Sequence, residues 1–118
     1  MKGSQKNQAI IVHNILRQIG LSTKLKGTKI LLSAVMLALT CTDDFIILND
    51  IYKQLSYKYK LSPKYIENAI SYSLKHLAGT GFKKNFEKIF DLEFSEDFYS
   101  NKTIIEEVTR VIKIQYEN

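Results

Sequence analysis

The sequence between residues 48 and 78 predicts two helices joined by a tight turn. Apolar residues recur at helical spacing in both halves of this stretch, and K-L-S-P stands between them. Ser62 is suited to cap the second helix, and Pro63 to occupy its first position, where the missing N–H of proline costs nothing. Two helices joined in this way, the second with a buried face, describe a helix-turn-helix. We therefore place a helix-turn-helix at residues 48–78, with the first helix ending near Tyr59 and the second running from Pro63 to Ala78.

Helical periodicity extends over most of the chain. Apolar residues recur every three or four positions in segments that begin near residues 6, 85 and 103, and residues 28–39 are apolar nearly all round. A helix that is apolar on every side must be covered by neighbours, so we expect residues 28–39 to form the central helix. Thr103, with Glu106 three residues later, matches a capping box at the start of the last helix. Because no run favours a strand, the sequence predicts an all-α domain of about six helices.

Size and charge limit the classes of function. At 118 residues the chain should form one helical domain, residues 1–118. Its 17 Lys and Arg against 12 Asp and Glu give a net charge of +5, which favours polyanionic partners but is also found in many lysine-rich proteins without them. Cys41 is the only cysteine, so no intrachain disulfide can form, and a cytoplasmic location is expected. The longest apolar run, Ile30–Leu39, is too short to cross a bilayer, so no membrane partner is expected.

The outward positions of the predicted second helix carry the candidate DNA-contacting side chains. An α-helix fills the major groove of DNA, and the preceding helix and turn hold it against the phosphates. The positions expected to face outward are all polar: Lys64, Tyr65, Glu67, Asn68, Ser71, Tyr72 and Lys75. Four lysines add charge near the turn, with no acid between Asp50 and Glu67: Lys53, Lys58, Lys60 and Lys64. A generic helical hairpin would also be polar on its solvent-facing side, so the pattern alone favours the two interpretations about equally.

Three short segments match the motifs of a known family. Residues 18–27 read Q-I-G-L-S-T-K-L-K-G, residues 51–59 read I-Y-K-Q-L-S-Y-K-Y, and residues 65–70 read Y-I-E-N-A-I. In this order they are similar to the elements E-I-G-V-P-A-H-I-K-G, L-Y-P-x-I-A-K-K-F and R-V-E-R-A-I, of which the first is the most specific. On these segments, the span Ile15 to about Glu96 resembles the C-terminal DNA-binding effector domain of the sporulation master response regulator of endospore-forming bacteria.

The resemblance implies a winged-helix-like, response-regulator type of effector domain without strands, which regulates transcription by binding double-stranded DNA. A homodimer and tandem copies on adjacent DNA boxes both stay open. The base-contacting residues that it implies are Tyr65, Glu67, Asn68 and Ser71. Glu67 keeps the family's glutamate, whereas Tyr65, Asn68 and Ser71 stand where the family has arginines. Because arginine is the commonest bidentate reader of guanine, we expect an altered or relaxed sequence preference. Phosphate contacts are expected from Lys58, Lys60, Ser62, Lys64 and Lys75.

In the family, a phosphoacceptor receiver domain precedes this region. Met1 stands a few residues before the first predicted helix, so the chain is expected to be either a stand-alone relative or a piece cut from a longer protein. The target sequence and the sign of regulation are open.

Other functions find less support. His13 and His76 are too few for a zinc site without cysteine partners, so no metal or other cofactor is expected. No nucleophile, base and oxyanion set is apparent, so an enzyme is not expected. The alternative is a protein-interaction module that kept the fold but lost specific DNA binding, acting as an antagonist or partner of a full-length regulator. The observation behind it is a group of tyrosines around the recognition surface, a residue type enriched at protein interfaces: Tyr52, Tyr57, Tyr59, Tyr65 and Tyr72.

Overall fold

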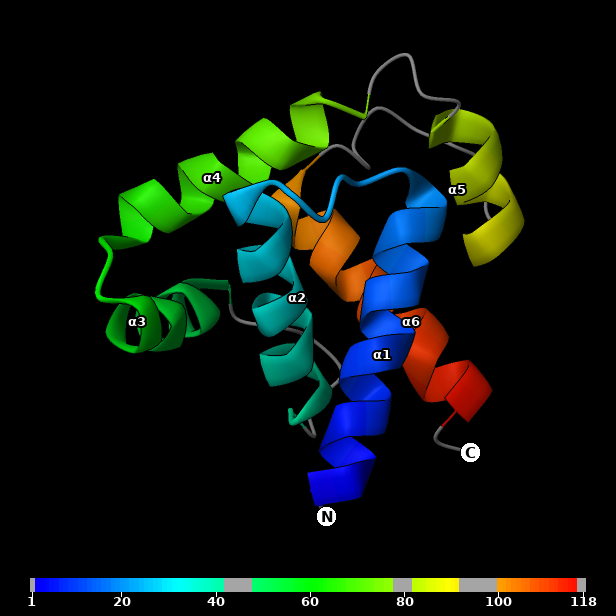
Figure 1. The fold of residues 1–118 in the computed structure, drawn as a ribbon, viewed down its shortest axis with the longest axis horizontal. Helices are drawn as coiled ribbons and strands as arrows, with labels where there is room; N and C mark the ends of the chain where they lie inside the picture. Colours follow the sequence, from blue (N-terminus) through cyan, green and yellow to red (C-terminus); the bar gives the residue numbers. More distant parts are fainter. Residues whose placement is uncertain (1, 42–47, 78–81, 92–99, 117–118) are drawn as a thin grey trace.

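The computed structural model describes residues 2–41, 48–77, 82–91 and 100–116. Over these ranges it contains six helices and no strand, which confirms the predicted all-α fold (Figure 1). The helices are α1 (Lys2–Ile19), α2 (Lys26–Leu39), α3 (Leu48–Tyr59), α4 (Pro63–Lys75), α5 (Phe82–Phe90) and α6 (Asn101–Tyr116).

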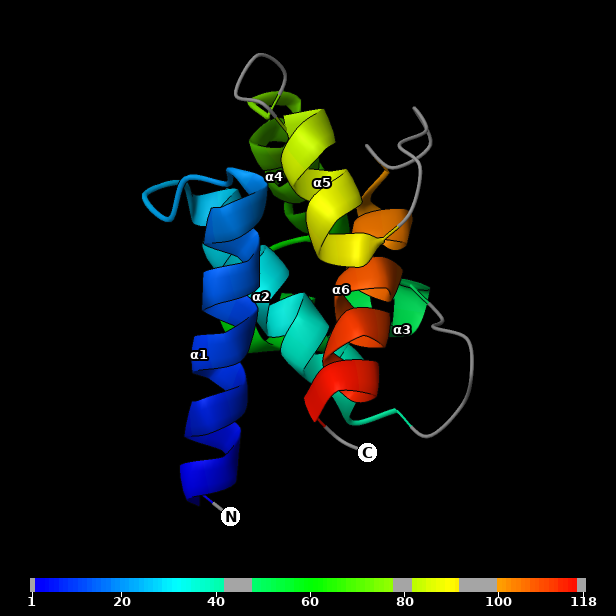
Figure 2. The same ribbon diagram turned by 90° about the vertical axis from the view of Figure 1, so that its right-hand side faces the viewer.

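Helix α2 lies at the centre of the domain. It packs against α1, α3, α4 and α6, and Figure 2 shows α1 and α6 on either side of it. Nine of its residues are buried, including Gly27 and Thr28 in its first turn. The expectation of a central helix covered by its neighbours is therefore confirmed.

The core joins the apolar stripes that the periodicity predicts. Helix α1 contributes Val12, Ile15, Leu16 and Ile19, and α5 contributes Phe86 and Phe90. From α3, α4 and α6 come further buried side chains: Ile51, Leu55, Ile66, Ile70, Leu74, Ile104, Ile105, Val108 and Ile112. Helices α3 and α4 pack against each other and against α2, while α1, α5 and α6 contact one another (Figure 1).

Five helix boundaries differ from the sequence prediction, four of them in α1, α2, α4 and α5. Helix α1 begins at Lys2, before residue 6; α2 begins at Lys26, before Thr28; α5 begins at Phe82, before Asn85; and α4 ends at Lys75. Gly27 accounts for the second difference, because a glycine after a polar stretch resembles a connector. A Cβ at this position would lie 1.9 Å from the backbone oxygen of Ala69. Glycine therefore lets the first turn of α2 approach the backbone of α4.

The predicted capping box at Thr103 is wrong. Helix α6 already begins at Asn101, and Thr103 lies within its first turn. The cap is Ser100, whose hydroxyl oxygen accepts a hydrogen bond of 3.1 Å from the backbone N–H of Thr103. Ala78, the predicted end of the second helix of the helix-turn-helix, lies outside the described residues.

Candidate nucleic-acid interface

The turn between α3 and α4 is held by Ser56, Lys60 and Leu61. Lys60 adopts a left-handed backbone conformation, with a φ of 56°. The backbone N–H of Leu61 donates to the carbonyl of Ser56 at 3.3 Å, which is the bond of a Schellman helix end. The hydroxyl of Ser56 in turn donates to the carbonyl of Leu61. The pair of bonds fixes the direction in which the chain leaves α3.

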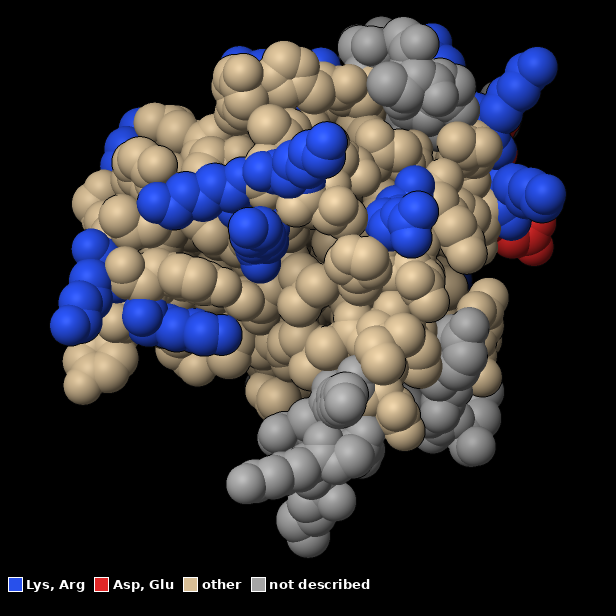
Figure 3. Space-filling view, in the orientation of Figure 1, with Lys and Arg blue, Asp and Glu red and all other residues tan. Residues whose placement is uncertain are grey.

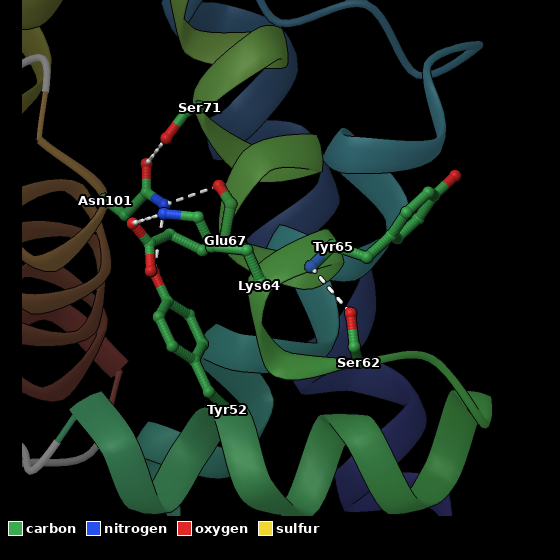
Figure 4. Close-up of polar contacts among 7 residues, drawn as sticks. All are labelled: Tyr52, Ser62, Lys64, Tyr65, Glu67, Ser71 and Asn101. Carbon is green, nitrogen blue, oxygen red and sulfur yellow. Dashed lines mark hydrogen bonds and ion pairs between the residues drawn. The ribbon is translucent and has the colours of Figure 1, made fainter.

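Ser62 caps the N-terminus of α4, as predicted. Its side chain accepts a hydrogen bond of 3.1 Å from the backbone N–H of Tyr65, and Pro63 occupies the first helical position (Figure 4). A serine hydroxyl that accepts in this way still has its own proton to donate. Capping is therefore compatible with a phosphate contact.

Helix α4 has one buried and one exposed side. Ile66, Ile70, Ser73 and Leu74 are buried, and the exposed side chains include Lys64, Asn68 and Lys75. These three repeat at helical spacing on one stripe of the helix. At about 1.5 Å per residue, Lys64 and Lys75 are roughly 16 Å apart along the axis, somewhat more than the width of the major groove of about 12 Å. The stripe thus has an amide near its middle and an ammonium at each end.

On the α6 side of this stripe, Asn101 connects three helices. Its side chain is buried, with 8% of the residue exposed. The amide nitrogen donates to the hydroxyl of Tyr52 at 2.9 Å and to the carbonyl of Glu67 at 3.0 Å (Figure 4). The amide oxygen accepts from the hydroxyl of Ser71 at 3.1 Å. Asn101 thereby ties α4 to both α3 and α6.

This network also affects Tyr52. Burial raises the pKa of its hydroxyl above the usual value of 10.0, and the negative charge of Glu67 acts in the same direction. The hydrogen bond from Asn101 opposes the shift. Tyr52 is therefore a neutral, buried member of the site.

On the α2 side, a groove runs beside the contact between α4 and the start of α2. Figure 4 shows Tyr65 pointing to the opposite side of α4 from Ser71 and Asn101. The groove has a volume of about 320 Å³ and is lined by Leu25, Lys26, Gly27, Tyr65, Asn68, Ala69 and Tyr72. Asn68 therefore lies at its edge.

The predicted phosphate-contacting lysines are all exposed. Lys64 lies 3.8 Å from the carboxylate of Glu67, and the Lys58 ammonium lies 5.3 Å from the centre of the Tyr59 ring. Figure 3 shows Lys and Arg side chains spread over the face that carries α2, α3 and α4. Among the residues coloured by type there, acidic ones are visible only near the right-hand edge. The face seen in Figure 3 is therefore mainly basic over α2, α3 and α4.

The tyrosines predicted to surround this surface divide into two groups. Tyr52 is buried and Tyr59 half-buried, with the Tyr59 hydroxyl 2.6 Å from that of Ser33. Tyr57, Tyr65 and Tyr72 are exposed, Tyr57 by 89%. Only these three are available to a partner.

A comparison with family models assigns the chain. The model described as "Sporulation initiation factor Spo0A C terminal" matches residues 12–112. The chain belongs to this family. The Spo0A C-terminal domain is a helical DNA-binding effector domain of a transcription regulator, which agrees with the six helices and with the resemblance in the sequence. Searches of curated proteins and of solved structures found no significant match.

Within the Spo0A C-terminal fold, the predicted base-contacting residues do not share one environment. Asn68 is exposed in the middle of the outward stripe, and Tyr65 borders the groove. Glu67 and Ser71 are half-buried and turn toward Asn101. Asn101 was missed in the sequence because it stands in a segment without a motif.

Metal and membrane sites were also sought. Within the part of the chain that the structure describes, no group of three or more His, Cys, Asp or Glu residues could hold a metal ion. No helix there has the length and apolar character needed to span a bilayer.

Proposed function

We propose that this chain regulates transcription by inserting α4 into the major groove of duplex DNA and reading bases chiefly through Asn68. The observation that carries the proposal is the stripe of Lys64, Asn68 and Lys75 on the exposed side of a capped helix. The asparagine amide is suited to bidentate recognition of adenine. The flanking ammonium groups are suited to phosphates on the two edges of the groove.

Ser71 and Glu67 have smaller roles in this proposal. The hydroxyl of Ser71 already donates its proton to Asn101, so donating to a base instead would cost that hydrogen bond. The carboxylate of Glu67 lies near Lys64, on the side of α4 that faces Asn101 (Figure 4). With one asparagine as the main reader, the expected sequence preference is relaxed and centred on adenine.

Two variants separate phosphate contacts from base contacts. Lys60→Ala combined with Lys64→Ala should weaken binding to all duplexes alike and flatten the dependence of affinity on salt. Asn68→Ala should leave the salt dependence intact and change the preference between sequences. Fluorescence anisotropy with several duplexes at two salt concentrations measures both effects. If the protein binds DNA but neither variant changes it, the binding surface lies elsewhere.

A second candidate function is a protein-interaction module. The exposed tyrosines support it, since 89% of Tyr57 and 57% of Tyr72 are accessible. Tyrosine offers a large contact area at low entropic cost. Mixing the chain with a full-length regulator of the same family tests this candidate: a mixed dimer without DNA binding by the chain itself favours it.

A further inference from the structure

The start of α2 is placed beside the recognition helix by a backbone contact. A Cβ on Gly27 would lie 1.9 Å from the backbone oxygen of Ala69 and 2.3 Å from the hydroxyl of Ser73. The first turn of α2 therefore lies directly against the middle of α4. It does so on the side of α4 that carries Tyr65 and Tyr72, as the lining of the groove shows.

Lys26 brings a positive charge to this contact. Its side chain is exposed, and its ammonium lies 5.1 Å from the centre of the Tyr65 ring. This distance is within the usual range of a cation–π interaction. The aromatic ring directs the ammonium along the edge of α4, while the nitrogen keeps its capacity to donate hydrogen bonds to another group.

The charged residues that precede and follow Lys26 in this part of the chain are all basic. Residues 1–42 contain no Asp or Glu, and their basic residues are Lys2, Lys6, Arg17, Lys24, Lys26 and Lys29. Lys24 and Lys29 are exposed on either side of Lys26 along the chain. The start of α2 is therefore a basic surface without an acidic partner of its own in that segment.

We propose that Lys26, supported by Lys24 and Lys29, binds the sugar–phosphate backbone of duplex DNA beside the recognition helix. The inference rests on the proposed function and adds a contact outside the helix-turn-helix. Lys64 stands with Glu67 toward the α6 side of α4, and Lys26 stands over Tyr65 on the α2 side. Lys26 therefore adds a phosphate contact on the α2 side of α4, outside the stripe of Lys64, Asn68 and Lys75.

The test compares Lys26→Gln with Lys84→Gln. Lys84 is also exposed, but it belongs to α5, which packs on α1 and α6 away from α4. Affinity for a mixed-sequence duplex is measured by anisotropy over a range of salt concentrations. Each phosphate contact contributes about 0.9 to the slope of log K against log salt. Lys26→Gln should therefore lower the slope by about 1, weaken binding to all duplexes several-fold and leave sequence preference intact, while Lys84→Gln changes little.

A third variant, Lys64→Gln, separates failure of this inference from failure of the proposed function. If Lys64→Gln lowers the slope and Lys26→Gln does not, the α2 contact is refuted and DNA binding by α4 stands. If the unaltered protein does not bind duplex DNA even at low salt, both are overturned. Equal losses in Lys26→Gln and Lys84→Gln would indicate a general charge effect and also overturn the α2 contact. Unchanged urea midpoints in the three variants show that the fold is retained.

Discussion

Replacing Asn101 with alanine tests whether a buried amide holds α4 in place. The substitution removes three hydrogen bonds, to Tyr52, Glu67 and Ser71. The hydroxyl of Ser71 is half-buried and can donate to water instead, and the carbonyl of Glu67 lies inside a helix. The loss of these two bonds is therefore the smaller part of the cost. Tyr52 is only 5% exposed, so its hydroxyl loses its partner at a cost of about 1–3 kcal/mol. With about 1 kcal/mol for the remaining bonds, Asn101→Ala should lower the free energy of unfolding by about 2–4 kcal/mol.

Urea denaturation followed by circular dichroism measures this loss. Asn14→Ala, the same change at an exposed position of α1, is the matched control and should stay within about 0.5 kcal/mol of the unaltered protein. In the Asn101→Ala background, Tyr52→Phe removes the orphaned hydroxyl, so the double variant should be less destabilised than the sum of the single changes by about 1 kcal/mol. Strict additivity, or a loss equal to that of Asn14→Ala, would refute the reasoning.

Three further predictions follow from the same geometry. Gly27→Ala should destabilise the domain by about 1–3 kcal/mol in thermal or urea unfolding, because the new methyl group meets the backbone of α4. Helix propensity alone would favour alanine by about 1 kcal/mol. A stabilised variant would therefore contradict the close contact. Lys60→Gly should raise the free energy of unfolding by about 0.5–1 kcal/mol, because glycine adopts a φ of 56° without strain. The same change should weaken DNA binding, because it removes a positive charge. A gain in affinity for DNA would contradict the phosphate role of Lys60. The pKa of Tyr52 is raised in the folded protein, so the contribution of this shift to the free energy of unfolding is complete below the unfolded pKa of about 10 and is lost as pH rises through the folded pKa. The loss of stability at alkaline pH should therefore be smaller in Tyr52→Phe than in the unaltered protein. Identical profiles of stability against pH in the two proteins would argue against the shift.

Local features of the helix-turn-helix could be predicted from the sequence. Ser62 and Pro63 affect only the first turn of α4, so the N-cap role of Ser62 and the first-position role of Pro63 could be predicted without knowledge of the fold. The apolar periodicity of α1 and the all-round apolar character of α2 likewise determined which faces are buried. The spacing of the apolar residues also gave the number and order of the helices.

Contacts between distant segments could not be predicted. Asn101 meets Tyr52 and Ser71 across 49 and 30 residues, and no spacing in the sequence marks those partners. At the start of α6, the sequence pattern indicated Thr103 as the cap. The structure uses Ser100, whose hydroxyl also donates to that of Thr103 at 2.8 Å.

The start of α2 was predicted at Thr28 instead of Lys26 for a related reason. Helix propensity disfavours glycine, so Gly27 was assigned to a connector. The packing of α2 on α4 requires a residue without a side chain at that point, and this tertiary contact outweighs the local preference.

The central claim is that α4 reads DNA through Asn68, and selection from a random duplex pool tests it most directly. The unaltered protein and the Asn68→Ala variant are each used to select duplexes, and the recovered sequences are titrated against scrambled controls. The account predicts a motif that includes adenine and is preferred at least about tenfold, or about 1.4 kcal/mol, over its scramble, with the preference at one position lost in the variant. The same motif from both proteins, or no duplex binding at low salt, would contradict it.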